Sequence, residues 1–182
     1  TDYVQKVNRE SEIKKDIVKT KNLKKESRFE VTWDVSFKEK YVDDEGLHYI
    51  YQEDGIFYDL LPLGSEFVSE SLVVSESGNV LTQGDYNCEL TNNYKHSGRT
   101  LLKISIAAPT KNEYEFTYDT SHSYTSINDY GRNLLNSVAY ESGNMRIGEG
   151  RPDDGGKITD KDILKDIDQD TDDEKFAYAE AR

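Results

Sequence analysis

The chain has 182 residues, of which 35% are hydrophobic and 32% are charged, and its net charge is −13 with a pI of about 4.7. This length suits one all-β domain with an extension. The excess of negative charge repels phosphate groups, so nucleic acid and anionic membrane surfaces are excluded as expected partners.

The aromatic and cysteine contents further limit the fold class and the kinds of site that the chain can form. The chain contains 13 Tyr and 6 Phe, and residues of this kind favour half-buried strands. Cys88 is the only cysteine, which rules out an internal disulfide and a zinc site built from several thiolates. No stretch approaches the length of a transmembrane helix, and no signal peptide follows Thr1. We expect a segment of a longer, extracellular polypeptide.

The N-terminal third contains the clearest strand. Residues 1–12 are polar and are expected to form a lead-in. Ile13, Lys15 and Ile17 then alternate with charged residues, which favours a strand with Lys15 on its apolar face, although a helix is the alternative. From Phe29 to Phe37 an apolar residue occupies every second position, the pattern of a strand with one buried face.

Further strands follow at regular spacing. The expected strands span residues 55–61, 67–74, 86–91, 101–106, 114–120 and 134–140, with a short one at 49–51. Residues 38–54, 92–99 and 121–132 are expected to be connections. Pro62 and Gly64 end the strand that carries Asp59.

The pattern predicts an all-β fold, an antiparallel two-sheet immunoglobulin-like sandwich over residues 13–145. Residues 146–182 are Gly-rich and then acidic, so we expect an irregular C-terminal extension or linker there, with residues 176–181 as a further short strand.

Several motifs, in order, resemble the repeat domains of Gram-positive surface adhesins and pilins of the collagen-adhesin class. They are the early Ile-Lys-Ile alternation around Lys15, the aromatic strand FEVTWDVSF, the run FYDLLPLGSEF, the strand RTLLKI and the closing LLNSVAY. The sharpest are the Asp-Leu-x-Pro-x-Gly turn at Asp59 and Asn136 four residues before Tyr140. The resemblance covers residues 12–144.

The resemblance implies a spontaneous isopeptide bond between Lys15 and Asn136, assisted by Asp59, with Lys19 as the fallback nucleophile. Burial would lower the pKa of the lysine and raise that of the aspartic acid, giving a neutral amine and a carboxyl able to donate a hydrogen bond to the Asn136 carbonyl. The alternative is that Lys15 is a surface residue, Asp59 forms a turn and Asn136 satisfies a buried backbone group.

The sequence gives weaker indications of a metal site or of catalytic residues. Four acidic residues have a spacing reminiscent of a calcium loop: Asp166, Asp168, Asp170 and Glu174. Thr171 and Ala177 stand where an EF-hand needs Gly and Glu, so we expect a solvated acidic linker, with weak Ca²⁺ binding as the alternative. His48, His96 and His122 are expected to be surface residues, and no Ser occupies a nucleophile elbow.

We therefore expect a non-enzymatic repeat of a bacterial cell-wall-attached surface protein, adjoining sister repeats. The alternative is a module that binds a host matrix protein or a glycan through its tyrosines and its 92–99 and 121–132 loops. No cofactor is expected apart from Ca²⁺.

Overall fold

The computed structural model describes residues 8–43, 46–48, 54–107, 113–125, 134–142, 145–147 and 177–181. The expected strand at 49–51 lies outside them. In the described part of the chain, no helix has both the length and the apolar character needed to cross a membrane.

The first sheet is built on a long hairpin. In chain order its strands are β1 (Asn8–Leu23), β2 (Arg28–Asp43), β3 (Gly46–His48), β5 (Ser65–Phe67), β6 (Val73–Glu76), β7 (Asn79–Val80) and β10 (Glu113–Ser123). They pair antiparallel in the order β1-β2-β10-β6-β7, with β3 on β2 and β5 on β10. A 3-10 turn, η1 (Lys24–Glu26), joins β1 to β2.

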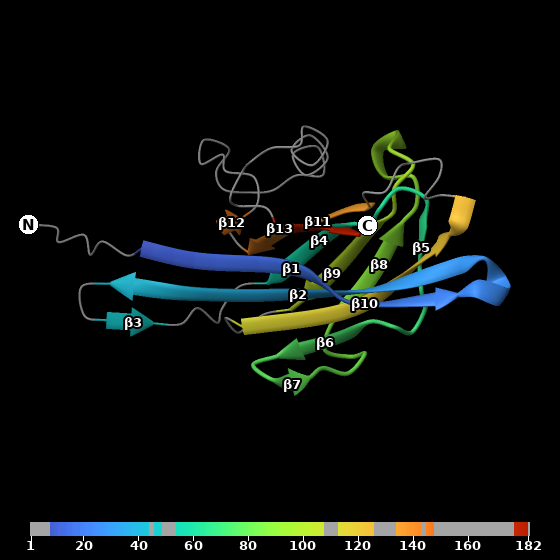
Figure 1. Ribbon diagram of the computed structural model, residues 1–182. Helices are drawn as coiled ribbons and strands as arrows, with labels where there is room; N and C mark the ends of the chain where they lie inside the picture. The colour runs from blue at the N-terminus through green and yellow to red at the C-terminus, as the bar shows by residue number, and fades with distance from the viewer. Residues whose placement is uncertain are drawn as a thin grey trace, which may run out of the picture.

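The second sheet packs behind the first (Figure 1). Its strands are β4 (Gly55–Leu60), β8 (Asn87–Thr91), β9 (Leu101–Ile106), β11 (Leu134–Ser142), β12 (Met145–Ile147) and β13 (Ala177–Ala181). The antiparallel order is β12-β11-β4-β9-β8, and β13 pairs with β11. A second 3-10 turn, η2 (Tyr94–His96), precedes β9. The all-β, two-sheet antiparallel sandwich predicted from the sequence is confirmed in the described residues.

Several boundaries differ from the expectation. The interval 67–74 is not one strand, because the chain turns after β5 and Glu70 adopts a positive φ of 69° before β6 begins at Val73. β1 begins at Asn8 rather than Ile13, and β10 continues to Ser123, beyond its expected end at Thr120. Met145–Ile147 form strand β12 where an irregular segment was expected.

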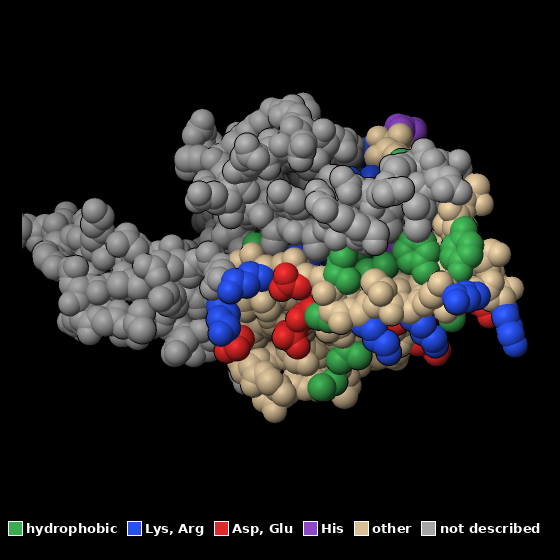
Figure 2. All heavy atoms as spheres, in the orientation of Figure 1, with side chains coloured by type: hydrophobic (Ala, Val, Ile, Leu, Met, Phe, Trp, Pro, Cys, Tyr) green, Lys and Arg blue, Asp and Glu red, His purple; other side chains and the backbone are tan. Residues whose placement is uncertain are grey.

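The alternation in β2 and β10 forms the core between the sheets. The buried side chains of this core, drawn from both sheets, are Val31, Trp33, Val35, Phe37, Phe57, Leu61, Val74, Leu102, Ile104, Ile106, Tyr114, Phe116, Tyr118, Val138 and Tyr140. Side chains of both charge signs are spread over the face seen in Figure 2. In β2 and β10, burial of large apolar groups on one side only is what the period of two in the sequence predicts.

Candidate functional site

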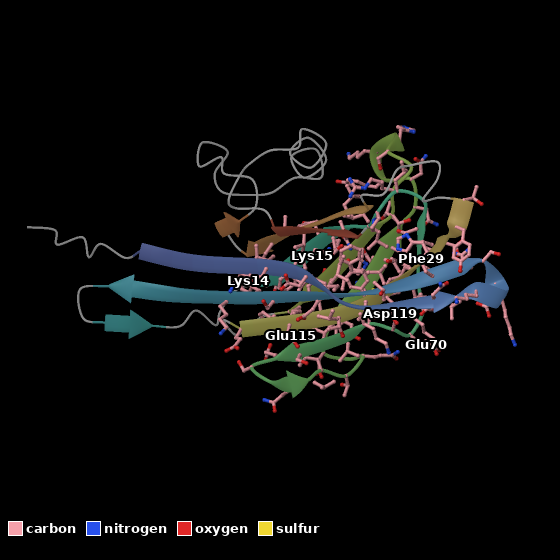
Figure 3. The ribbon with its side chains drawn as sticks, viewed as in Figure 1. Lys14, Lys15, Phe29, Glu70, Glu115 and Asp119 are labelled. Atoms are coloured by element: carbon pink, nitrogen blue, oxygen red, sulfur yellow. The ribbon has the colours of Figure 1, made fainter. Side chains whose placement is uncertain are left out.

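Lys15 lies inside the sandwich. Its register partner on β2 is Val35, a core residue, and Ile13 and Ile17 on either side of it pack against the same core. The lysine is only 4% exposed. Figure 3 shows it on the side of β1 that faces the second sheet. The strand predicted around Lys15 is therefore confirmed, and the helix alternative is wrong.

Asp59 and Asn136 face Lys15 from the second sheet. Asp59 follows Phe57 on the inward face of β4, and its register partner on β11 is Val138. Asn136 precedes Val138 on the same face of β11. Both polar side chains are fully buried. A buried amide and a buried carboxyl are costly unless they are hydrogen-bonded, so their partners matter.

Asp59 and Asn136 share Lys15 as a hydrogen-bond partner. The Lys15 ammonium nitrogen Nζ donates to Asp59 Oδ2 at 2.6 Å and to Asn136 Oδ1 at 2.5 Å. The structure thus brings together the three residues singled out in the sequence, from strands β1, β4 and β11. Lys15 and Asn136 are separated by 121 positions in the chain.

Tyr118 is a fourth member that the sequence did not identify. Its hydroxyl donates to Asp59 Oδ1 at 2.7 Å and accepts from Lys15 Nζ at 3.0 Å and from Asn136 Nδ2 at 2.7 Å. The alternation of β10 places Tyr118 in the core, but periodicity says nothing about which polar groups of the other sheet its hydroxyl meets.

Aromatic rings enclose the lysine. Its Nζ lies 5.6 Å from the centroid of Trp33 and 5.5 Å from that of Tyr118, the range in which a cation is attracted to a ring face. The four polar groups therefore have one another and aromatic rings as surroundings. Such a low-dielectric environment strengthens every charge interaction in it.

Burial also changes the protonation equilibria. Desolvation lowers the pKa of Lys15 from 10.5 to about 8, against the opposing effect of the Asp59 carboxylate, while Arg99 adds to the lowering. Desolvation raises the pKa of Asp59, and the neighbouring Lys15, Tyr118 and Arg99 only partly counter it. Both changes favour the neutral amine and the neutral carboxyl, as expected for a nucleophilic lysine beside an acid.

The turn that follows Asp59 at the end of β4 is held by Arg99. Pro62 ends the strand, and Arg99 donates through Nε to the Leu61 carbonyl at 2.9 Å and through Nη2 to the Leu60 carbonyl at 3.0 Å. Gly64 takes the positive φ of 77° that the turn requires. The Asp-Leu-x-Pro-x-Gly sequence therefore does form a turn, but Asp59 sits before it in the strand. The alternative that Asp59 is itself a turn residue is wrong.

One expected contact differs. The sequence-based hypothesis has Asp59 donating to the carbonyl of Asn136. Among the described residues, the two side chains exchange no hydrogen bond and instead share Lys15 and Tyr118 as partners. Nζ reaches between them because Lys15 approaches from the opposite sheet. Asp59 is consequently placed to exchange a proton with Nζ rather than to polarise the amide directly.

Lys19, the fallback nucleophile, lies away from this cluster. The register of β1 against β2 shifts between Ile17 and Lys19, and Lys19 is exposed. A bulge of this kind changes which face the following side chains occupy, so the shared parity of Lys15 and Lys19 in the sequence is not kept in the structure.

The candidate calcium ligands Asp166, Asp168, Asp170 and Glu174 lie outside the described residues. Within the part of the chain that is described, no group of three or more His, Cys, Asp or Glu side chains is arranged to hold a metal ion.

His122 is not the surface residue expected from the sequence. It is fully buried on β10, its ring stacks on Phe29 with centroids 4.8 Å apart, and its Nε2 lies 2.7 Å from Thr120 Oγ1. Thr120 in turn accepts from Trp33 Nε1 at 2.9 Å. Desolvation lowers the pKa of His122 to about 4, with a contribution from Arg28. The strand continues past its expected end, which carries His122 into the core.

No protein-family model matches the sequence, and a search of curated proteins gives no match either. Solved structures do show similarity. The chain resembles the pilus backbone protein RrgB of Streptococcus pneumoniae with a TM-score of 0.46 and 14% identity, covering 75% of this chain and 32% of that one.

Two further structures are similar. The major pilin SpaA of Corynebacterium diphtheriae, which is described as having stabilizing isopeptide bonds, gives a TM-score of 0.47 and 13% identity over 70% of this chain and 30% of that one. The collagen binding domain of the Erysipelothrix rhusiopathiae surface protein RspB gives a TM-score of 0.45 and 16% identity, covering 84% of this chain and 41% of that one. This chain spans less than half the length of each of the three, and none of them is an enzyme.

Similarity at this level concerns the arrangement of strands.

Proposed function

We propose that this chain is a non-enzymatic, immunoglobulin-like module of a Gram-positive cell-surface protein, a stalk or adhesive repeat in which Lys15 and Asn136 form an intramolecular isopeptide bond assisted by Asp59. One observation carries the proposal: the amine, the carboxyl and the amide from three distant strands meet within hydrogen-bonding distance in the core. The extracellular, wall-attached location and the neighbouring repeats are proposed from the sequence resemblance.

The reaction needs only an amine, a carboxyl and an amide. The neutral Lys15 amine attacks Cγ of Asn136, and Asp59 accepts the proton that Nζ must lose. One proton is passed on to the amide nitrogen, which leaves as ammonia. The product is an amide between Nζ and Cγ, so the chain loses one NH₃. Fixed proximity supplies most of the acceleration, and Nζ already lies 2.5 Å from the carbonyl oxygen of the target amide. The reaction occurs once per molecule and is not enzymatic turnover.

The bond would close a large loop. By analogy with a disulfide, a covalent link across 121 positions would restrict the unfolded chain by about 4–5 kcal/mol. It would tie β1 at the edge of one sheet to β11 of the other, so that force on the chain could not peel the sheets apart there. An amide also resists reduction, unlike a disulfide.

The test is the intact mass of the full chain under denaturing conditions. A mass below that of the sequence by one ammonia is expected, and Asn136→Ala and Lys15→Ala should each remove that deficit. Lys14→Ala, next to Lys15 on the opposite face, is the matched control and should keep it. A wild-type mass equal to that of the sequence would contradict the proposal.

A host matrix protein or a glycan as partner is a second part of the proposal, from the sequence resemblance. Saturable binding of the purified chain to collagen, other matrix proteins or glycans would establish an adhesive role. A chain that binds none of them would be a stalk module only.

A further inference from the structure

We infer that Tyr118 is a catalytic residue of this cross-linking reaction, whose hydroxyl passes a proton from Asp59 to the departing nitrogen of Asn136. The inference rests on the proposed function, since it assigns a new role within the same site. Neither the sequence motifs nor the expected roles of the other three residues include this tyrosine.

The Tyr118 hydroxyl touches every reacting group. It lies 3.0 Å from the nucleophile Nζ, 2.7 Å from Asp59 Oδ1 and 2.7 Å from Asn136 Nδ2, the atom that must leave. The other oxygen of Asp59 contacts Nζ at 2.6 Å. A continuous path therefore runs from Nζ through the two oxygens of Asp59 and the tyrosine oxygen to Nδ2.

The chemistry requires such a path. When the amine attacks, Nζ becomes a positively charged centre with one proton too many, and the carbonyl oxygen becomes an oxyanion. The amide nitrogen must gain a proton before it can leave, because an amide anion is a very poor leaving group. The net change is the transfer of one proton from Nζ to Nδ2.

The path performs this transfer without leaving a charge on the protein. With the carboxyl proton of neutral Asp59 on Oδ1, Nζ gives its proton to Oδ2, Oδ1 gives its proton to the Tyr118 oxygen, and Tyr118 gives its own to Nδ2. The bond between Cγ and Nδ2 then breaks, its electron pair leaves with NH₃, and the oxyanion re-forms the carbonyl. Asp59 and Tyr118 end in the protonation states in which they began.

Hydrogen-bond directions fit this sequence of events. Before reaction Nδ2 is a planar amide nitrogen and donates to Tyr118, which donates to Asp59. After attack the amide resonance is lost, so Nδ2 acquires a lone pair and becomes an acceptor. With a proton on Oδ1 of Asp59, both hydrogen bonds can then reverse with no movement of heavy atoms. Burial raises the pKa of Tyr118, which keeps the phenol protonated and able to donate.

Two other groups could serve the leaving nitrogen and do not. Asp59 has no hydrogen bond to Asn136 among the described residues, because its oxygens are occupied by Lys15 and Tyr118. Arg99 is directed at the backbone carbonyls of Leu60 and Leu61. Tyr118 is the hydrogen-bond partner that the structure gives to Nδ2.

A structural role for the ring must be separated from the role of the hydroxyl. The Tyr118 ring packs against Phe116 and Phe67 with centroids 6.2 and 6.1 Å apart, and Tyr118→Phe keeps these contacts. Tyr114→Phe is a matched control: it removes a hydroxyl from a buried tyrosine on the same face of β10, one that donates to Glu76 at 2.9 Å.

The experiment follows bond formation in newly made chains. Full-length wild type, Tyr118→Phe and Tyr114→Phe are synthesised in a cell-free system, quenched in acid at intervals, and weighed intact. We expect wild type and Tyr114→Phe to lose ammonia at the same rate and Tyr118→Phe to do so at least ~10²-fold more slowly, the usual size of general acid–base assistance. Equal rates in all three would overturn the role of Tyr118 and leave the cross-link intact. Absence of ammonia loss in wild type would instead overturn the proposed function.

A second variant covers the case in which Tyr118→Phe does not fold, as judged by loss of a cooperative melt. A ring-fluorinated tyrosine placed at position 118 keeps the ring and the hydroxyl but makes the phenol more acidic. If the proton passes through this oxygen, the rate of ammonia loss changes, because general acid catalysis depends on the acidity of the donor. An unchanged rate would show that the hydroxyl is only a structural partner.

Discussion

Two buried polar clusters lie next to each other on the inward face of β10, and their members have different origins. The first joins Tyr118 to Lys15, Asp59 and Asn136, so four strands from both sheets contribute. The second cluster consists of Thr120 and His122 of β10 with Trp33 of the adjacent strand β2. Only the first cluster spans the sandwich.

Their chemistry differs accordingly. The first cluster holds an amine and a carboxyl whose pKa values burial moves toward each other, and it puts a nucleophile against an amide. The second has no amine and no carboxyl, and burial keeps its histidine neutral. Buried polar groups within one sheet thus complete the packing, whereas those shared between the sheets have the parts of a covalent link.

The largest effect is expected from Asp59→Ala in the first cluster. The substitution removes the proton acceptor, so no ammonia should be lost, and it leaves Lys15 buried without its ion-pair partner. Loss of the cross-link together with an unpaired charge should lower the free energy of unfolding by at least ~4 kcal/mol. Intact mass and urea denaturation measure the two effects.

Asp16→Ala is the control for this change, because Asp16 is an exposed acidic residue of β1 adjoining Lys15. It should keep the mass deficit and change stability by no more than ~0.5 kcal/mol. If Asp59→Ala still loses ammonia, the carboxyl has no part in the reaction.

The second cluster is expected to make the free energy of unfolding depend on pH. The folded-state pKa of His122 is about 4, below its ordinary value of 6.5, so the unfolded state binds the proton more readily between these values. The stability from the buried neutral ring is therefore fully present above pH 6.5 and is lost as pH falls toward 4, by about 3 kcal/mol in all.

Urea denaturation at pH 7 and pH 4.5 measures this loss. His122→Phe, which retains a ring to stack on Phe29, should lose less stability over the same interval while cross-linking as fully as wild type. An equal pH dependence in the variant and wild type would mean that other groups control acid unfolding.

The smallest effect is expected outside both clusters, at Lys19. Because it is exposed beyond the bulge in β1, Lys19→Ala should leave the ammonia loss complete and the stability within ~0.5 kcal/mol of wild type. Intact mass and denaturation again provide the readout. A missing cross-link in Lys19→Ala would make Lys19 the nucleophile in place of Lys15.

The sequence predicts the parts of this structure that depend on one strand at a time. Alternation from Phe29 to Phe37 places Trp33 and Val35 in the core, and the alternation around Lys15 places that lysine inward. The resemblance to a family, rather than any one strand, predicts the grouping of Lys15 with Asp59 and Asn136, and the structure brings the three side chains together.

What depends on two strands or on a local irregularity could not be predicted in this way. The bulge after Ile17 reverses the face of Lys19, although the residue types there show no sign of it. His122 becomes a core residue only because β10 stays paired with β2 past Thr120. The contacts of Tyr118 depend on how the two sheets are set against each other, which alternation within one strand does not encode.

The bond between Lys15 and Asn136 is tested most directly by tandem mass spectrometry of a tryptic digest of the purified wild-type chain. Trypsin does not cut after an acylated lysine, so we expect a branched product in which residues 15–19 are joined through Lys15 to Asn136 in residues 133–146, with the mass of one ammonia missing. Cleavage after Lys15, with residues 133–146 released as an unmodified linear peptide, would contradict it.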